Sequence, residues 1–341
     1  MQGMQFYQLG RFPQAVESFS KALSTSPQHG EAYLYRGASY YNLKDFKNCK
    51  TDLDQASKLL KNNTDVLLFY GYLYNDTKAF KKAITSLTSA ISAKPNLANA
   101  YNARGYSYQS LGNFRAAMAD YSSAIKADTT FALAYNNRGS AIYYNQDVAE
   151  PSKQDIKLAI KDFDKALQIE PRFCTARRNK GLAFSFLGLL DSAVSELGAA
   201  ISCEPQNPLN YAVRGSVNIK RESYNEALND FTQALERDNN YNEALIEMGI
   251  AKAYLGFSAE ADADFNTAIK SDKRYSALAW YGMAVNAAKS NDKAKMFRHL
   301  EDIRKTGFFK SHSNRKRLAD EKAFQPFKND KDFRELQVKL K

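Results

Sequence analysis

A glycine recurs along this chain at an almost constant interval, and this period restricts the fold more than any other feature. The recurring residues are Gly3, Gly37, Gly71, Gly105, Gly139, Gly181, Gly215 and Gly249. The interval is 34 residues throughout, except for 42 residues between Gly139 and Gly181. A period in this range predicts a solenoid in which each repeat is a hairpin of two helices.

Alanines and large apolar residues keep the same period. In the early repeats alanine, or once cysteine, stands twelve residues after the glycine, and alanine stands nineteen residues after it. The large apolar residues between these positions are Phe19, Leu53, Leu87, Tyr121, Phe163, Leu197, Phe231 and Phe265. A glycine inside a helix costs about 1 kcal/mol relative to alanine. A helix can accept this cost where small residues let it pack closely against a partner helix.

Together these residues form a recognisable pattern. Glycine is followed three residues later by tyrosine, then by alanine, a large apolar residue, alanine and in several repeats proline. This pattern resembles the tetratricopeptide repeat of bacterial multi-repeat proteins over roughly residues 1–273. The resemblance implies an all-α fold, a right-handed superhelical solenoid of about eight helix-turn-helix hairpins. It also implies that the glycine of the first helix faces the two alanine positions of the second helix. Residues 274–341 are then expected to form a C-terminal helical cap with a basic tail, in which Phe324, Phe327 and Phe333 cover the last repeat.

Two irregularities interrupt the register. Gly3 holds a mid-helix position, so we expect the first repeat to be truncated at its N-terminal side. The longer interval, 42 less 34 residues, indicates an eight-residue insertion within Asn145–Asp155, in the turn between the helices of the fifth repeat. Such insertions map to surface loops and in some proteins bind partners. A tolerated surface loop is the interpretation that we favour.

The formal net charge of +11 is concentrated in the tail. Residues 289–341 hold 16 Lys and Arg against 8 Asp and Glu, a net charge of +8, and the remaining 288 residues carry only +3. A basic patch is typical of nucleic-acid-binding proteins, but here acidic residues are interspersed and no stacking platform accompanies them. Nucleic-acid binding through the tail is therefore an alternative that we do not favour.

Opposite charges occur together in five repeats. The residues before the glycine and before the large apolar residue are Arg36 with Asp52, Arg104 with Asp120, Arg138 with Asp162, Lys180 with Glu196, and Arg214 with Asp230. The third repeat has Tyr70 and Ser86 instead and so lacks both charges. We interpret these residues as ion pairs between the two helices of a hairpin, rather than as a basic surface for an acidic partner.

The chain shows no catalytic or metal-binding spacing. None of the three histidines, His29, His299 and His312, has a second histidine or a glutamate at ligand spacing. The repeat uses most of the glycines, and no lysine follows a glycine-rich stretch as a phosphate-binding loop requires. We therefore predict no enzymatic activity, no metal and no cofactor.

The three cysteines give evidence on the cellular compartment in which the protein resides. Cys49, Cys174 and Cys203 form no CxxC pair, and a reducing, cytoplasmic location is the simplest interpretation. A periplasmic or envelope location stays open, because a targeting segment could precede a chain that begins inside a repeat. Cys174 and Cys203 should lie near the start of one helix and the end of its antiparallel partner. They would form a disulfide in an exported protein and would be small buried residues in the cytosol. The sequence contains no run of 18 apolar residues, so it predicts no transmembrane segment.

The family resemblance assigns the first helix of each repeat to the concave side of the solenoid. The residues that point there by register are rich in tyrosine and asparagine, which supply contact area and bind peptide backbone. The predicted partner-contacting residues are Tyr72, Asn102, Tyr106, Gln109, Asn136, Asn137, Tyr143, Tyr144, Arg178 and Asn179. Tyr35, Tyr41 and Phe69 share this register, and we expect about half of the tyrosines to be exposed.

We therefore predict a non-enzymatic scaffold that holds a peptide or protein segment in this groove. The clamp by which some family members hold a chaperone's C-terminal carboxylate is absent, because the positions around Asn137 and Asn179 carry other residues. The main alternative is that the chain is the interaction or regulatory half of a larger enzyme or envelope protein. The open N-terminal repeat also offers a surface for self-association.

Overall fold

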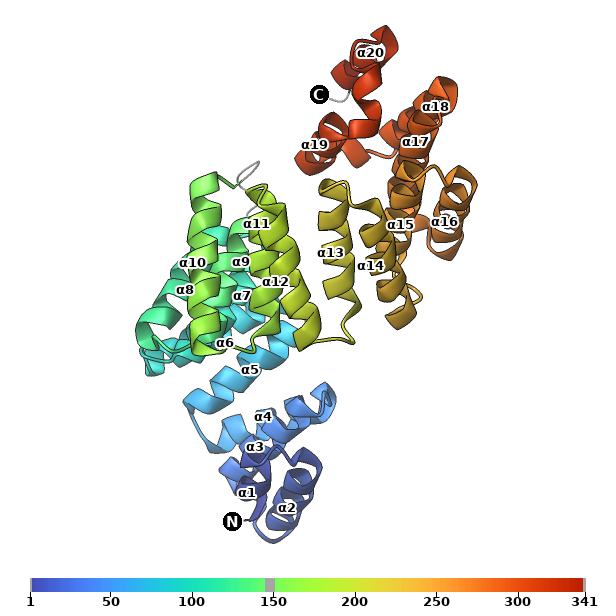
Figure 1. Ribbon diagram of the computed structural model, residues 1–341. Coiled ribbons are helices and arrows are strands. Elements are labelled where there is room, and N and C mark those ends of the chain that lie inside the picture. Colours follow the sequence, from blue (N-terminus) through green and yellow to red (C-terminus); the bar gives the residue numbers. More distant parts are fainter. Residues whose placement is uncertain (1, 145–150, 340–341) are drawn as a thin grey trace. The chain divides into compact units, whose positions relative to one another are not determined.

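The computed structural model describes residues 2–144 and 151–339 of the 341-residue chain. Every regular element in this part is a helix, and consecutive helices pack in pairs joined by short turns (Figure 1). These pairs are the consecutive helix-turn-helix repeats that the glycine period predicts. Among the helices of the described ranges, none is long and apolar enough to cross a membrane.

The helices alternate in role along the chain. The first helices of the pairs are α1 (Gln2–Gln8), α3 (Gly30–Asn42), α5 (Thr64–Asp76), α7 (Ala98–Ser110), α9 (Ala132–Tyr144), α11 (Cys174–Phe186), α13 (Pro208–Lys220) and α15 (Asn242–Tyr254). The second helices are α2 (Phe12–Thr25), α4 (Phe46–Leu59), α6 (Phe80–Ala93), α8 (Phe114–Ala127), α10 (Lys153–Ile169), α12 (Leu190–Cys203), α14 (Tyr224–Arg237) and α16 (Ser258–Ser271). The C-terminal elements, with 3-10 turns written as η, are η1 (Lys273–Tyr275), α17 (Ser276–Lys289), α18 (Lys293–Lys305), η2 (Phe308–Lys310), α19 (His312–Asp320), η3 (Lys322–Phe327) and α20 (Lys331–Lys339).

The chain divides into two compact units. Unit 1 contains residues 1–151 and 161–171, and unit 2 contains residues 152–160 and 172–341. Residue 273, where the sequence predicts the regular repeats to end, falls within unit 2, in which α16 packs against α17. Unit 2 therefore holds both the last regular repeats and the C-terminal helices.

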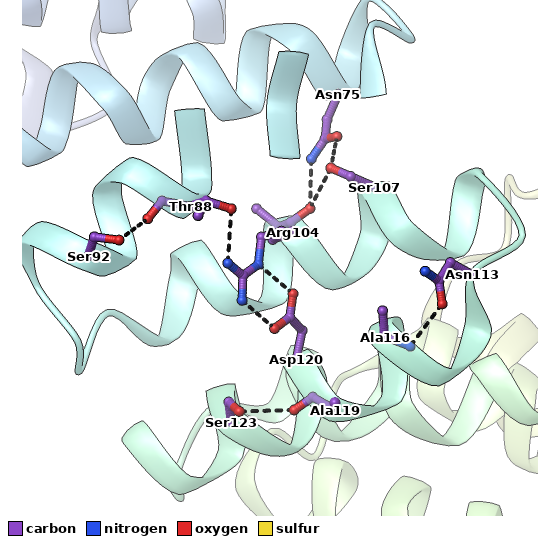
Figure 2. Close-up of polar contacts among 11 residues, drawn as sticks. Asn75, Thr88, Ser92, Arg104, Ser107, Asn113, Ala116, Ala119, Asp120 and Ser123 are labelled. Atoms are coloured by element: carbon purple, nitrogen blue, oxygen red, sulfur yellow. Dashed lines mark hydrogen bonds and ion pairs between the residues drawn. The ribbon is translucent and has the colours of Figure 1, made fainter. Parts of the chain in front are cut away.

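Local sequence explains where the helices begin and end. Asn113 caps α8, because its Oδ1 accepts a hydrogen bond from the Ala116 N–H at 3.1 Å (Figure 2). Pro208 stands in the first turn of α13, where its missing N–H would have no helical partner. The turn between α7 and α8 reverses the chain at Gly112, whose φ of +78° lies in the left-handed region that favours glycine.

The core of each pair is the predicted column of large apolar residues, which are buried throughout. A Cβ on Gly105 would lie 2.8 Å from Tyr121 Cε1 and 3.2 Å from the carbonyl oxygen of Ala117. The glycine therefore faces the ring of the large residue and the backbone at the first alanine position. This corrects our expectation that it faces the alanine side chains, because the ring occupies the space that a Cβ would need.

Substituting Gly105 by alanine is expected to lower the free energy of unfolding by about 1–2 kcal/mol, since overpacking outweighs the gain in helix propensity. Gly198 in α12 is the matched control, because its nearest neighbour would be Arg214 Nη1 at 3.7 Å from the added Cβ. We expect Gly198→Ala to raise stability by up to about 1 kcal/mol. Urea unfolding followed by circular dichroism distinguishes the two. A shift of the same sign in both variants would contradict the packing explanation.

Part of the predicted insertion lengthens a helix. α10 has 17 residues, whereas α8 and α12, the neighbouring second helices in sequence, have 14 each. The N-terminal end of α10 is capped by Ser152, whose Oγ accepts from the Asp155 N–H at 3.1 Å while its own N–H donates to Asp155 Oδ2 at 3.1 Å. Residues 145–150 of the predicted insertion lie outside the described part of the chain.

The C-terminal helices cover the last repeat, as the sequence predicts. Phe324 and Phe333 are buried and Phe327 is partly buried in one apolar cluster. The same cluster contains Phe265 of α16 and Tyr281 of α17. The apolar surface at the end of the repeats is therefore closed by residues of the chain itself.

Cys174 and Cys203 form a disulfide within unit 2. Cys174 begins α11 and Cys203 ends α12, and their Cα atoms are 5.8 Å apart. Of the two states that the sequence left open for this pair, the structure contains the disulfide. Cys49 is a free, buried thiol, and burial raises its pKa to about 12.

Candidate functional site

The predicted partner-contacting residues lie on one face of the first helices, which we call the inner face. We define it as the side chains three and two residues before the repeat glycine and one, four and five residues after it. Helices α5, α7 and α9 are neighbours in unit 1, and α11, α13 and α15 are neighbours in unit 2. Within each unit, the inner face is therefore a surface shared by successive repeats.

Asparagines of the inner face bind one another in unit 1. Asn137 Nδ2 donates to Asn102 Oδ1 at 3.0 Å, and Asn136 Nδ2 donates to Asn137 Oδ1 at 3.3 Å. Asn102 is 8% exposed and Asn136 is 4% exposed, so both side chains are buried. Their burial counts against direct contact with a partner, and we now assign them the role of supporting Asn137. Asn137 itself is partly exposed.

A further buried amide joins α5 to α7, and the sequence did not single it out. Asn75 Nδ2 donates to the carbonyl oxygen of Ala103 at 2.9 Å, and its Oδ1 accepts from Ser107 Oγ at 2.6 Å (Figure 2). Asn75 stands four residues after Gly71, which is an inner-face position. This register could have identified Asn75 from the sequence. Register alone, however, does not show whether an amide faces solvent or the next helix.

Tyr106 presents its ring to solvent, whereas the side chain of Gln109 is hydrogen-bonded to a core residue. Tyr106 is 46% exposed, and its ring makes an edge contact with Phe80 at a centroid distance of 6.2 Å. Gln109 Oε1 accepts a hydrogen bond at 2.9 Å from the hydroxyl group of Tyr121, whose ring lies in the core. Gln109 therefore satisfies a buried phenol, and Tyr106 offers the kind of large ring that dominates binding hot spots.

Three partly buried rings form an aromatic cluster on the inner face of α3 and α5. The ring centroids are 6.0 Å apart for Tyr41 and Tyr72, 6.2 Å for Tyr41 and Phe69, and 5.8 Å for Phe69 and Tyr72. The Lys44 ammonium lies 5.2 Å from the centroid of Tyr41, within the range of a cation–π interaction. Burial raises the pKa of Tyr72 to about 12.

Of the other tyrosines in this register, Tyr35 packs between repeats, and two have side chains outside the described part of the structure. Tyr143 and Tyr144 are the last two residues of α9, and their side chains lie outside the described part of the structure. Tyr35 is partly buried and stacks on Phe19 at a centroid distance of 6.3 Å. Among the described tyrosines of the inner face, Tyr106 is exposed, whereas Tyr35 and the two tyrosines of the aromatic cluster pack between repeats.

The inner face of unit 2 uses Arg178 to join two repeats. Arg178 Nη1 in α11 donates to Asn210 Oδ1 in α13 at 3.1 Å, and Asn210 is fully buried. Asn179, the next residue, is partly buried. This geometry assigns Arg178 first to the packing of α11 against α13 and only second to a partner.

Two further residues of this inner face escaped the sequence analysis. Phe186 is exposed at the end of α11, and the Lys220 ammonium of α13 lies 5.7 Å from its ring centroid. Lys220 Nζ also donates to Ser185 Oγ at 3.1 Å. Both residues stand five positions after their repeat glycine, the register that had singled out Tyr144. An exposed ring beside an ammonium group is a candidate contact point within unit 2 itself.

The predicted ion pairs between the two helices of a hairpin are confirmed. Arg104 Nε and Nη2 bind the two carboxylate oxygens of Asp120 at 2.8 Å each, and Nη1 donates to Thr88 Oγ1 of α6 at 3.0 Å (Figure 2). The other four pairs are Arg36 with Asp52, Arg138 with Asp162, Lys180 with Glu196, and Arg214 with Asp230. In the third repeat, Tyr70 donates instead to Asp54 of α4 at 2.6 Å. The arginines are therefore structural.

Comparison with known proteins identifies the repeats. A family model described as "TPR repeat" matches residues 3–44, and one described as "Tetratricopeptide repeat" matches residues 64–97 and 98–131. Tetratricopeptide repeat protein 13 of Homo sapiens is 32% identical over 136 residues, which are 38% of this chain and 16% of that protein. The chain matches curated relatives over 16–34% of their own lengths.

Solved structures show the same fold at low sequence identity. A tetratricopeptide repeat protein from Parabacteroides merdae superposes with a TM-score of 0.56 at 15% identity, covering 73% of this chain and 96% of that chain. The APC/C hetero-tetramer Cut9–Hcn1 contains a chain that superposes with a TM-score of 0.60 at 15% identity, covering 96% of this chain and 58% of that chain. With the glycine period, the buried apolar column and the family models, these likenesses lead to one conclusion. The chain contains tetratricopeptide repeats and has an all-α solenoid fold.

Proposed function

We propose that this chain is a non-enzymatic scaffold that binds a peptide or protein segment along its inner face. Tetratricopeptide repeats support protein–protein interaction, which makes an interaction scaffold the general function. Two side chains carry the finer proposal: the exposed ring of Tyr106 on α7, and the partly exposed amide of Asn137 on α9, which binds Asn102 one turn before Tyr106. The ring supplies apolar contact area, and the amide can donate to and accept from the backbone of an extended segment.

The core of the proposed site spans α5, α7 and α9 of unit 1. The aromatic cluster at its N-terminal side is held by ring contacts, and Asn137 is held by Asn102 and Asn136. Side chains fixed by their neighbours lose less conformational freedom on binding, which favours affinity. Tyr106 lies on α7, between these two fixed groups in sequence. A partner therefore needs an apolar or aromatic side chain for Tyr106 and a free backbone amide for Asn137.

The alternatives receive less support. Several cations of the C-terminal tail pair with carboxylates, such as Lys293 with Asp330 at 2.6 Å and Lys295 with Asp262 at 2.6 Å, which weakens the case for nucleic-acid binding. The chain matches its curated relatives only over short parts of their length. We therefore retain the other alternative, that the chain is the interaction or regulatory half of a larger protein. That alternative uses the same inner face and differs only in what is joined to it.

Substituting Tyr106 by alanine is expected to reduce partner capture from a lysate of the source organism by about tenfold or more, the usual effect of truncating a hot-spot tyrosine. The matched control is Leu158→Ala in α10, because Leu158 is 47% exposed and Tyr106 is 46% exposed. The partner is quantified by mass spectrometry after capture on each immobilised protein. Equal retention by all three proteins would contradict binding at the inner face and would direct attention to the insertion or the tail.

A further inference from the structure

A C-terminal stretch of the chain, residues 312–327, packs against inner-face positions of α15 in unit 2. We call it the closing segment, and it comprises α19 and η3. Arg317 Nη2 binds Glu247 Oε1 of α15 at 2.7 Å. The Tyr254 hydroxyl group of α15 donates to the Glu321 carboxylate and accepts from the Ala323 N–H at 3.1 Å. The closing segment thus contacts α15 through two side chains and one backbone N–H.

The residues that receive the closing segment stand at inner-face positions. Glu247 is two residues before Gly249, as Asn137 is before Gly139. Tyr254 is five residues after Gly249, the register shared by Tyr144 and by the exposed Phe186 of α11. The positions that the sequence assigned to partner contact in the middle repeats are therefore occupied, in the last repeat, by a segment of the same chain.

The contacts define a ligand chemistry. The Arg317 guanidinium lies 4.7 Å from the ring centroid of Tyr281, within the range of a cation–π interaction. The Tyr281 hydroxyl group donates to the carbonyl oxygen of Arg317 at 3.1 Å, and Phe324 makes an edge contact with the same ring at 6.0 Å. The recognised groups are an arginine, a glutamate four residues later and a phenylalanine three residues after that.

The polar part of this interface lies near solvent. The Arg317 side chain is 32% exposed and the Glu247 side chain is 19% exposed. Lys322 pairs with Glu222 at the turn after α13, and both side chains are more than half exposed. Burial, followed by the charge of Glu321, raises the pKa of Tyr254. An exposed ion pair such as Lys322 with Glu222 contributes little to the stability of the closed state.

We propose that the closing segment is an intramolecular ligand, and that the surface formed by Glu247 and Tyr254 of α15 with Tyr281 of α17 is a binding surface for a segment with this arginine–glutamate–phenylalanine spacing. The surface is closed while the closing segment is bound and opens when it is displaced. The proposal deepens the proposed function, because it assigns a ligand chemistry to one part of the inner face. Its test uses a peptide of known sequence and does not depend on the partner that Tyr106 contacts.

The experiment adds a fluorescent peptide of residues 311–327 to the full chain. A tethered segment has an effective concentration of about 1 mM, so micromolar peptide should not displace it from the unaltered protein. The double variant Arg317→Ala with Glu321→Ala loosens the closing segment. We expect this variant to bind the peptide at least tenfold more tightly than the unaltered protein does, as measured by fluorescence anisotropy. Amide hydrogen exchange of residues 312–327 should become at least tenfold faster.

Two controls make the result decisive. Arg334→Ala with Glu335→Ala removes the same two residue types from the exposed surface of α20 and should behave like the unaltered protein. Adding Glu247→Gln to the loosened variant should abolish peptide binding again. The proposal is overturned if exchange stays slow in the loosened variant, or if exchange becomes fast and no peptide binds. The latter result would make residues 312–327 an integral part of the core. Failure of the Tyr106→Ala prediction would leave this outcome unaffected.

Discussion

Replacing Arg104 with methionine is expected to lower the free energy of unfolding by about 3 kcal/mol, because it leaves a buried carboxylate without its partner. The Asp120 side chain is 8% exposed, and both of its oxygens bind Arg104. Arg104 also reaches Thr88 of the preceding pair, so the substitution releases a contact between repeats (Figure 2). Urea unfolding, monitored by circular dichroism, measures the change.

The double substitution Arg104→Met with Asp120→Leu separates the charge effect from the packing effect. Removing both charges of a buried pair is often nearly neutral, so we expect the double variant to lose about 1 kcal/mol or less. The third repeat, with Tyr70 and Ser86 at these positions, already folds without the pair. A double variant less stable than Arg104→Met would contradict the account of this pair as a buried charge that needs its partner.

Removing the disulfide has the second large expected effect. Cys174 and Cys203 are 29 residues apart, and closing a loop of that length stabilises the folded chain by about 2–4 kcal/mol through the unfolded state. We expect Cys174→Ala with Cys203→Ala to lose about that much, measured by urea unfolding under oxidising conditions. Adding a reductant should destabilise the unaltered protein by the same amount and leave the double variant unchanged.

The remaining thiol provides the control for this prediction. Cys49 is buried with a raised pKa, so alkylation of the native protein should leave it unmodified. Alkylation of Cys174 or Cys203 in the unreduced protein would contradict the disulfide. Because disulfides persist mainly in oxidising compartments, we propose a periplasmic or envelope location in place of the cytoplasmic one that the cysteine count favoured.

The repeat architecture was predictable because it depends on a period that every repeat shares. The glycines, the apolar column from Phe19 to Phe265 and the charge pairs recur at fixed spacing, and each has a partner within its own hairpin. Spacing is sufficient to predict such contacts, since both residues belong to one helix-turn-helix unit. The capping role of Phe324 and Phe333 followed from the need to close the last apolar surface.

The use of each inner-face residue was less predictable, because it depends on how one repeat turns against the next. Asn102 and Gln109 have the register of partner-contacting residues, yet one binds Asn137 and the other binds Tyr121. The return of residues 312–327 to α15 could not be predicted either, because the closing segment has no period. Its glutamate and arginine find partners by tertiary proximity and not by spacing along the chain.

The central claim is that partners bind to the inner face, and site-specific photo-crosslinking tests it most directly. A benzophenone amino acid placed at Tyr106 is compared with the same group at Leu158, since both positions are almost equally exposed. After irradiation in a lysate of the source organism, we expect one or more protein adducts from position 106 and none of the same mass from position 158. Identical adducts from both positions, or adducts from position 158 alone, would contradict binding at the inner face.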